Sequence, residues 1–378
     1  MAPLNILHVF RAPVGGLFRH VLDLTREQIA RGHRVGMIAD SLTGGATAEK
    51  ILGEIAPSLA LGLSRYPMYR HANPGDMLAL AHVMRRVARA KADVVHGHGA
   101  KGGAYARLSF NARQAVRAYT PHGGSLLFGH ETLAGKFYLA TEKILMLRGD
   151  LFLFESGYSE QIFRRKIGSP HGLVRVVHNG VSRAEFAPIE ARPDATDLVF
   201  MGELRPVKGI DVLIEAVAML KRDGRRVTAT LVGSGPERES LQIQVGRLGL
   251  APDICFKTAM PAREALTLGR IMVVPSRAES LPYVVLEAAA GNKPLITTKV
   301  GGITEIYGPL ADTLVTPEDA GALARAIAGA LDNPAAAAET AKQLRDRVAA
   351  GFSVETMVDG VLAGYRDAME MLQKHGRR

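Results

Sequence analysis

Cysteine is scarce in this sequence of 378 residues, where Cys255 is the only one. A single cysteine excludes an intrachain disulfide framework and a cluster of thiolate metal ligands, which is the usage expected in the cytoplasm. No run of 18 or more apolar residues is present, so no membrane-spanning helix is predicted. The first residues, MAPLNILHVF, lack a basic segment before a cleavable apolar one, and we expect no signal peptide.

Acidic residues are scarce in the first half of the chain. Up to Arg183 the sequence holds 24 Lys and Arg against 12 Asp and Glu, a net charge of +12, whereas the remainder holds 23 against 25, a net charge of −2. Basic clusters lie at 85–91 and 164–166. No helix-turn-helix, zinc-finger or RNP-like stretch accompanies them, so nucleic acid is not the expected partner. An anionic membrane surface or a pyrophosphate-linked acceptor fits better.

The length predicts two domains, each large enough for a sizeable core. Short β-branched runs alternate with amphipathic helices, which predicts an α/β class with two doubly wound parallel sheets. Residues 184–196 contain two prolines and no apolar period, and we interpret them as the linker between domains 1–185 and 186–353. Residues 40–75, rich in Gly and Pro, are expected to be irregular.

The stretch VPSRAESLPYVVLEAAA, residues 274–290, is the most informative in the chain. A buried strand is predicted to end at its start, followed by a polar loop and a helix. Ser280 is expected to cap that helix and Pro282 to lie in its first turn. The amides of Ser280 and Leu281 would then form an anion site at a helix N-terminus.

Two carboxylates flank this anion site. Glu279 lies in the loop after the strand, and Glu287 lies about two turns along the helix. Either acid taken alone could be a solvated surface residue. Together with a phosphate-binding amide cluster, they indicate a nucleotide-sugar site, in which one acid reaches sugar hydroxyls and the other a ribose.

A second loop, GELRPVKG at 202–209, also follows a predicted strand and opens a helix. Arg205 and Lys208 can converge there on a diphosphate, Arg bidentately. Gly233 follows the next strand. A dinucleotide fingerprint would need a third glycine at position 238 and finds Arg238, so NAD is excluded.

In the first half, Gly15 and Gly16 follow a strand and open a helix, where backbone amides can approach a ligand. His98 belongs to a His-x-His pair that could ligate zinc, but no third ligand stands nearby in the sequence, so no metal site is expected. His122 lies in a glycine-rich loop and is either a donor contact or a loop histidine bonded to backbone.

The stretches at 274–290 and 202–209 resemble the signature of the family 4 retaining glycosyltransferases, also called group 1, which have the GT-B fold. Ser280 stands where the family often has glycine. The resemblance implies two Rossmann-like domains facing a central cleft. It also implies that the helix at 354–373 packs back on the first domain.

The same resemblance implies a role for each candidate residue. Arg205 and Lys208 would offset the charge of the leaving diphosphate, Glu287 would bind ribose, and Glu279 would hold sugar hydroxyls. His122 would act at the donor sugar, and His98 would lie in the cleft. The remaining donor-binding residues would be Gly15, Gly16, Gly233, Ser280, Leu281 and Pro282. No cofactor and no metal is expected, because the nucleotide sugar is a substrate.

The expected activity is transfer of a hexose to a lipid-linked or polysaccharide acceptor in the synthesis of exopolysaccharide or lipopolysaccharide. A cytoplasmic location, peripheral to the membrane, follows from that activity. A nucleotide-sugar epimerase of similar fold and a non-catalytic nucleotide-sugar-binding protein are the alternatives.

Overall fold

The computed structural model describes residues 2–109, 115–123, 129, 131–374 and 376. The chain divides into unit 1, Met1–Asn179 with Val354–Arg378, and unit 2, Gly180–Ser353. The division falls before the linker predicted at 184–196, because Val181 already forms a parallel bridge to Ser353 within unit 2.

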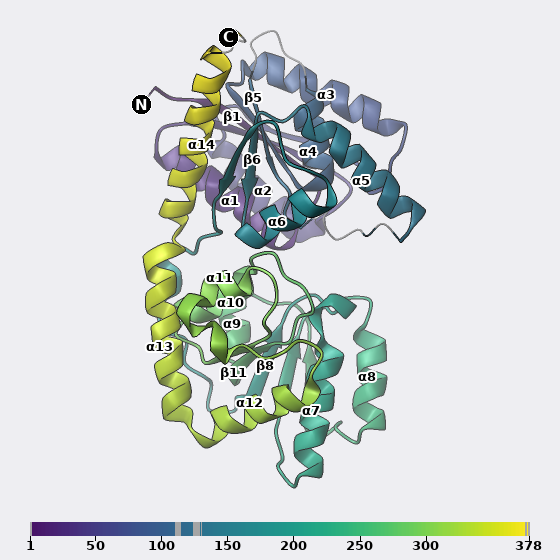
Figure 1. Cartoon of the computed structure of the whole chain (residues 1–378), viewed down its shortest axis with the longest axis vertical. Helices are drawn as coiled ribbons and strands as arrows, with labels where there is room; N and C mark the ends of the chain where they lie inside the picture. The colour runs from purple at the N-terminus through teal and green to yellow at the C-terminus, as the bar shows by residue number, and fades with distance from the viewer. Residues whose placement is uncertain (1, 110–114, 124–128, 130, 375, 377–378) are drawn as a thin grey trace. The chain divides into compact units, whose positions relative to one another are not determined.

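Unit 1 contains a seven-stranded parallel sheet among its described residues, in the order β3-β2-β1-β4-β5-β6-β7 (Figure 1). The strands are β1 (Asn5–Phe10), β2 (Arg34–Asp40), β3 (Leu63–Tyr66), β4 (Val94–His98), β5 (Val116–Thr120), β6 (Leu151–Phe154) and β7 (Leu173–Val176). The helices are α1 (Gly15–Ala30), α2 (Gly45–Ile55), α3 (Gly75–Ala90), α4 (Gly99–Leu108), α5 (Leu133–Met146), α6 (Gly157–Lys166) and α14 (Val354–Lys374).

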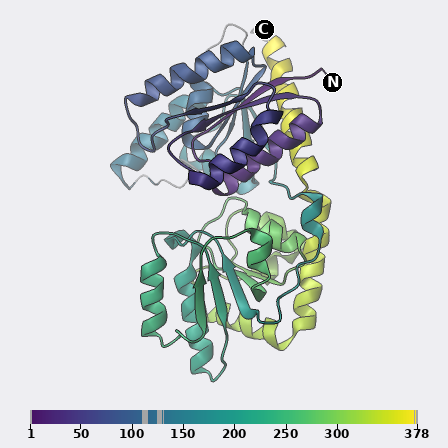
Figure 2. The ribbon, with the colours of Figure 1, turned by 180° about the vertical axis from the view of Figure 1, so that it is seen from behind.

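Helices cover both faces of this sheet because its strands are apolar on both sides. Ile6 packs in one cluster with α1 and α14, whereas its neighbour Leu7 packs in another with α3 and α4. Figure 2 shows the purple helices α1 and α2 on their face of the sheet. The sheet is therefore doubly wound, as the alternating pattern predicts.

The C-terminal helix α14 completes the core of unit 1. Its buried side chains pack with Leu151 and Leu153 of β6. Glycines allow the close approach: a Cβ at Gly360 would lie 3.0 Å from Val177, and one at Gly364 would lie 3.2 Å from Leu151. None of the described helices combines the length and the apolar character needed to cross a membrane.

The expectation of irregular structure over 40–75 is wrong. The segment contains the helix α2 and the edge strand β3. The glycines that suggested a loop instead start the helix, since Gly44 caps it in a left-handed conformation with φ of 97°. Buried Ala48, Leu52 and Ile55 recur at helical spacing and fix its inner face.

Unit 2 contains a five-stranded parallel sheet in the order β10-β9-β8-β11-β12. The strands are β8 (Thr196–Met201), β9 (Ala229–Val232), β10 (Ile254–Lys257), β11 (Gly269–Val274) and β12 (Leu295–Thr297). The helices are α7 (Ile210–Arg222), α8 (Arg238–Arg247), α9 (Ala262–Leu266), α10 (Tyr283–Ala290), α11 (Ile303–Tyr307), α12 (Ala320–Asp332) and α13 (Pro334–Gly351). Helices α7, α8 and α12 pack on one face, and α9, α10, α11 and α13 on the other.

Candidate active site

In unit 2 the direction of strand addition reverses between β8 and β11, which are neighbours in the sheet. Ligands of open α/β sheets bind at such a switch point, outside the carboxyl ends of the strands. The loop with Lys208 follows β8, and the loop with Glu279 follows β11. Topology therefore brings together two residues that stand 71 positions apart in the sequence.

The two side chains form an ion pair. Lys208 Nζ donates to Glu279 Oε1 at 2.6 Å, and Ser276 Oγ donates to the same oxygen at 2.7 Å. The carboxylate is 9% exposed and the lysine side chain 23% exposed. A positive charge is thus held in a fixed, partly water-excluded position, where it can stabilise a negative group.

A clamp that the sequence did not predict joins the two loops. Arg277 binds Asp211 of α7 through two hydrogen bonds, at 2.7 and 2.9 Å, and its amide donates to Val207 O at 2.8 Å. Burial raises the pKa of the Asp211 carboxyl, but the bonds and charge of Arg277 outweigh it and hold that pKa below its ordinary value. The two loops also touch at Gly209, which has φ of 63°. A Cβ at Gly209 would lie only 2.1 Å from the carbonyl oxygen of Pro275.

Glycines also bring further loops to this edge of the sheet. A Cβ at Gly301 would lie 1.7 Å from Glu279 O, and one at Gly302 would lie 1.9 Å from Ser280 O. In the same way, a Cβ at Gly233 would lie 1.9 Å from Gly202 O. The loops after β8, β9, β11 and β12 therefore lie against one another at the carboxyl ends of the strands.

The expected start of α10 is wrong. The helix begins at Tyr283 with Pro282 as its cap residue, so Ser280 does not cap it, and the amides of Ser280 and Leu281 precede it. A residue before proline favours extended backbone, and Leu281 is also anchored in the core, which delays the helix. Glu287 lies on α10 and is half-buried.

Arg205 lies apart from the Lys208–Glu279 pair. Its guanidinium is 3.4 Å from Glu203, and the side chain is 44% exposed. It is the cap residue of the 3-10 helix Pro206–Lys208, so it stands one short turn before Lys208. Its exposed position leaves the guanidinium accessible to an anion.

In unit 1 the switch point lies between β1 and β4. Helix α1 begins after β1 with Gly15 at φ of 62°, and Gly15 and Gly16 are both exposed. Its cap residue, Val14, offers no side-chain acceptor to the first-turn amides. The glycines therefore present the start of a 16-residue helix to solvent, as an anion site requires.

A hydrogen-bonded chain of histidines, buried except for the half-buried His122, lies beside this switch point. Gln28 Oε1 is 2.9 Å from His8 Nε2, His8 Nδ1 is 2.9 Å from His98 Nε2, and His98 Nδ1 is 3.1 Å from His122 Nε2. His122 has φ of 51°, a conformation that few side chains adopt. The predicted site residues His98 and His122 are thus hydrogen-bonded to each other.

The expectation that no third ligand stands near the His-x-His pair is wrong. Nitrogens of His8, His96 and His98 lie within 4.8 Å of one another, as do those of His20, His98 and His122. His8 and His20 could not be assigned to this cluster from the sequence because they lie far from the pair in the chain. The one sequence signal for His8 is a histidine within an apolar strand.

Hydrogen bonds link the rings of this cluster to neighbouring side chains. His96 is bonded to Tyr365 OH and Thr120 Oγ1, both at 2.8 Å, and His20 Nδ1 lies 3.0 Å from Asn179 Oδ1. Burial lowers the pKa of His8 to about 4 and the pKa of His96 well below its ordinary value. The cluster is therefore uncharged at neutral pH, and every ring nitrogen of His8, His96 and His98 has a hydrogen-bond partner.

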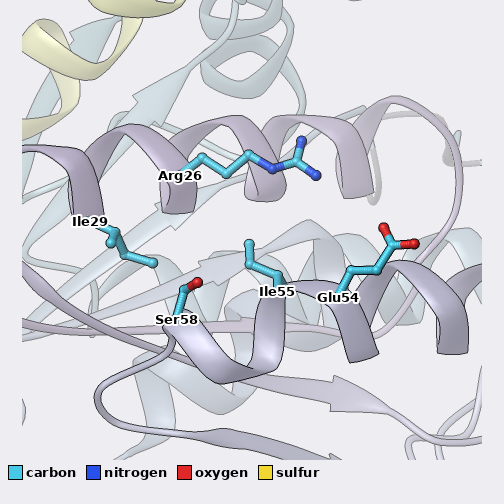
Figure 3. Close-up of a pocket in the computed structure, with 5 residues that line it drawn as sticks. All are labelled: Arg26, Ile29, Glu54, Ile55 and Ser58. Carbon is cyan, nitrogen blue, oxygen red and sulfur yellow. The ribbon is translucent and has the colours of Figure 1, made fainter.

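A separate surface pocket contains none of these residues. It has a volume of about 240 Å³ and is lined by Arg26, Ile29, Glu54, Ile55 and Ser58 (Figure 3). Its lining comes from the second half of α1, from the end of α2 and from the 3-10 helix Ala56–Ser58 that follows, away from the exposed glycines at the start of α1.

Comparisons with known proteins agree with this geometry. The family model "Glycosyltransferase Family 4" matches residues 14–185, and "Glycosyl transferases group 1" matches residues 181–348. A glycogen synthase of Mycobacterium tuberculosis is 25% identical over 384 residues, covering 93% of this chain and 91% of that protein.

Solved structures share the fold. Sucrose-phosphate synthase from Thermosynechococcus elongatus superposes with a TM-score of 0.80 at 22% identity, covering 97% of this chain and 99% of that one. Anabaena HepE in complex with UDP-glucose superposes with a TM-score of 0.77 at 19% identity, covering 98% and 99%. The two parallel-sheet units, their motifs and both family models confirm the resemblance: the chain belongs to the group 1, family 4 glycosyltransferases, enzymes of GT-B fold.

Proposed function

We propose that this glycosyltransferase moves a hexose from a nucleotide sugar to a lipid-linked or polysaccharide acceptor, with retained anomeric configuration, in the synthesis of a cell-surface glycan. The observation that carries the proposal is the Lys208–Glu279 pair at the switch point of unit 2. A fixed ammonium beside a carboxylate suits a donor with an anionic diphosphate and a hydroxyl-rich sugar.

In this proposal the residues of unit 2 divide the donor among them. Lys208, with the exposed Arg205, offsets charge that develops on the leaving diphosphate. Glu279 orients Lys208 and accepts hydrogen bonds from sugar hydroxyls, while Glu287 accepts them from ribose. Ser280, Leu281, Pro282 and Gly233 shape the loops around these groups.

In unit 1 we assign His122 to the donor sugar and the amides of Gly15 and Gly16 to its phosphates. The reaction needs no metal, because cationic side chains and backbone amides stabilise the negative charge of the leaving diphosphate. Retention follows from front-face displacement, in which the leaving phosphate takes the proton of the acceptor hydroxyl. The complex of Anabaena HepE with UDP-glucose supports a uridine donor.

The basic character of the first half supports an acceptor carried on a lipid at the cytoplasmic face of a membrane. The charge of +12 up to Arg183 suits a pyrophosphate-linked acceptor as well as an anionic leaflet.

The donor is tested by thermal shift against UDP-, GDP-, ADP- and dTDP-sugars. A donor at about 100 times its Kd should add ~2.7 kcal/mol of apparent stability. Nucleotide release that requires an acceptor distinguishes a transferase from an epimerase, which needs none. A donor that binds without any turnover over a panel of lipid-linked and oligosaccharide acceptors would favour the binding protein instead.

A further inference from the structure

Helix α5, labelled in Figure 1, carries several large apolar side chains that are exposed. Leu133, Phe137 and Ile144 on the helix and Leu147 directly after it are between 54% and 86% exposed. The helix also has a buried side, because Leu139 and Met146 pack in the core of unit 1. It is therefore apolar on an outer face as well as on its core face.

These outer side chains form one stripe. Their spacing, with the exposed Ala140 between them, is i, i+4, i+7, i+11 and i+14. At about 100° per residue they fall within about 80° of arc along the whole helix. Scattered apolar residues on a surface need no explanation, but a continuous stripe indicates a docking surface.

Cations border the stripe on both sides. Lys136 and Lys143 are exposed along one edge, and Arg148 is exposed on the other. The acidic residue within the helix, Glu142, points inward instead and forms a buried ion pair with Arg107 at 2.6 Å. The outer face of α5 thus combines an apolar centre with positive flanks.

We propose that α5 docks unit 1 in the interface of an anionic lipid leaflet, with its apolar stripe among the acyl chains and its flanking cations at lipid phosphates. An amphipathic helix with Lys and Arg beside large apolar side chains has the composition of such interfacial helices. The inference rests on the proposed function and deepens it, because it names the surface by which the enzyme reaches a lipid-linked acceptor.

Charge favours a lipid over the other possible occupant, a second copy of this chain. Two copies joined through the same stripe would bring like charges together, which is unfavourable. The basic clusters on α3 and α6 have no comparable stripe, since the large exposed apolar side chains of α3 lie only in its first turn, before the cluster. Part of their charge is also engaged, since Arg164 pairs with Glu160 and Arg86 donates to Leu61 O at 2.7 Å.

The test is flotation of the full-length protein with vesicles of phosphatidylcholine alone or mixed with phosphatidylglycerol. We expect binding to the anionic vesicles that weakens as salt is raised. Phe137→Ser with Ile144→Ser, and separately Lys136→Ser with Lys143→Ser, should each weaken binding at least about tenfold. Ile243→Ser on α8, where the side chain is 66% exposed, is the matched control and should bind as wild type does.

Three results would overturn the inference: no wild-type binding at low salt, equal binding by the Phe137/Ile144 variant, or a wild-type dimer in sedimentation velocity that this variant converts to a monomer. Circular dichroism and the melting temperature check that each variant is folded. Donor binding, measured by calorimetry on the same preparations, separates the two proposals. If the protein binds the donor but not the vesicles, only the docking inference is refuted. If it does not bind the donor, the proposed function is refuted.

Discussion

Replacing Glu279 by Gln separates the chemical role of this residue from its structural one. The amide keeps an oxygen that can accept from Ser276 Oγ, but it loses the charge that holds Lys208 Nζ at 2.6 Å. A hydrogen bond to a charged group contributes about 1.5–3 kcal/mol. Because the Lys208 side chain is 23% exposed and can turn to water, we expect a loss of about 1–2 kcal/mol of stability.

The effect on turnover should be much larger than this. In the proposed site the Lys208 ammonium faces the leaving diphosphate, and misplacing it should lower kcat by about 10²–10³-fold, the loss typical of one preorganised electrostatic partner. The melting temperature should fall by only about 2–8 °C, at roughly 2–4 °C per kcal/mol for a unit of this size. The assay is release of nucleotide from the donor found by thermal shift, followed beside differential scanning calorimetry.

Asp253→Asn is the matched control. Asp253 is a buried carboxylate that pairs with Lys221 at 2.8 Å, but it precedes β10 and so lies at the amino end of the strands. We expect it to lower the melting temperature at least as much as Glu279→Gln while leaving turnover intact. Turnover of Glu279→Gln within twofold of wild type, with the expected loss of stability, would refute the catalytic role of the pair.

Three further results are expected. Activity should survive EDTA, since in the proposed site Lys208, Arg205 and backbone amides face the diphosphate, and a loss that Mg²⁺ restores would contradict this. Burial lowers the pKa of His8 and His20 from 6.5 to about 4, so the unfolded chain binds protons that the folded chain does not between those pH values. Urea unfolding should show stability falling from pH 6.5 towards 4 by ~1.4 kcal/mol per pH unit for each histidine, and an unchanged slope in His8→Asn would contradict this. Gly209→Ala should lose turnover through the contact with Pro275, whereas Gly224→Ala, at φ of 79° with no atom within 4 Å of its Cβ, should lose only about 1–2 kcal/mol of stability.

The sequence predicted the features that follow from strand periodicity. The apolar runs before Lys208 and Glu279 identified two parallel strands, and parallel strands end at the same edge of a sheet. That Lys208 and Glu279 lie at one edge was within reach of such reasoning. The sequence could not show whether the ammonium of Lys208 would pair with Glu279 or stay free, because that depends on the close contact of Gly209 with Pro275.

Features built from distant parts of the chain could not be predicted. The clamp of Arg277 on Asp211 depends on the turn made by Pro206–Lys208, and no local pattern specifies it. The bond from Tyr365 to His96 joins residues 269 positions apart, which the sheet order and the docking of α14 bring together. The start of α10 was misplaced because capping rules ignore that Leu281 is buried in the core.

The hydrogen bonds along the chain of histidines in unit 1 all run in the same donor-to-acceptor direction. A neutral imidazole has one N–H and one lone pair, so each ring that accepts at one nitrogen must donate from the other. With Gln28 Oε1 accepting from His8 Nε2, His8 Nδ1 must accept from His98, and His98 Nδ1 must accept from His122 Nε2. His122 is then left with a bare lone pair on Nδ1. The orientation of one amide on α1 thus decides, through two intervening rings, whether the last imidazole offers a proton or accepts one.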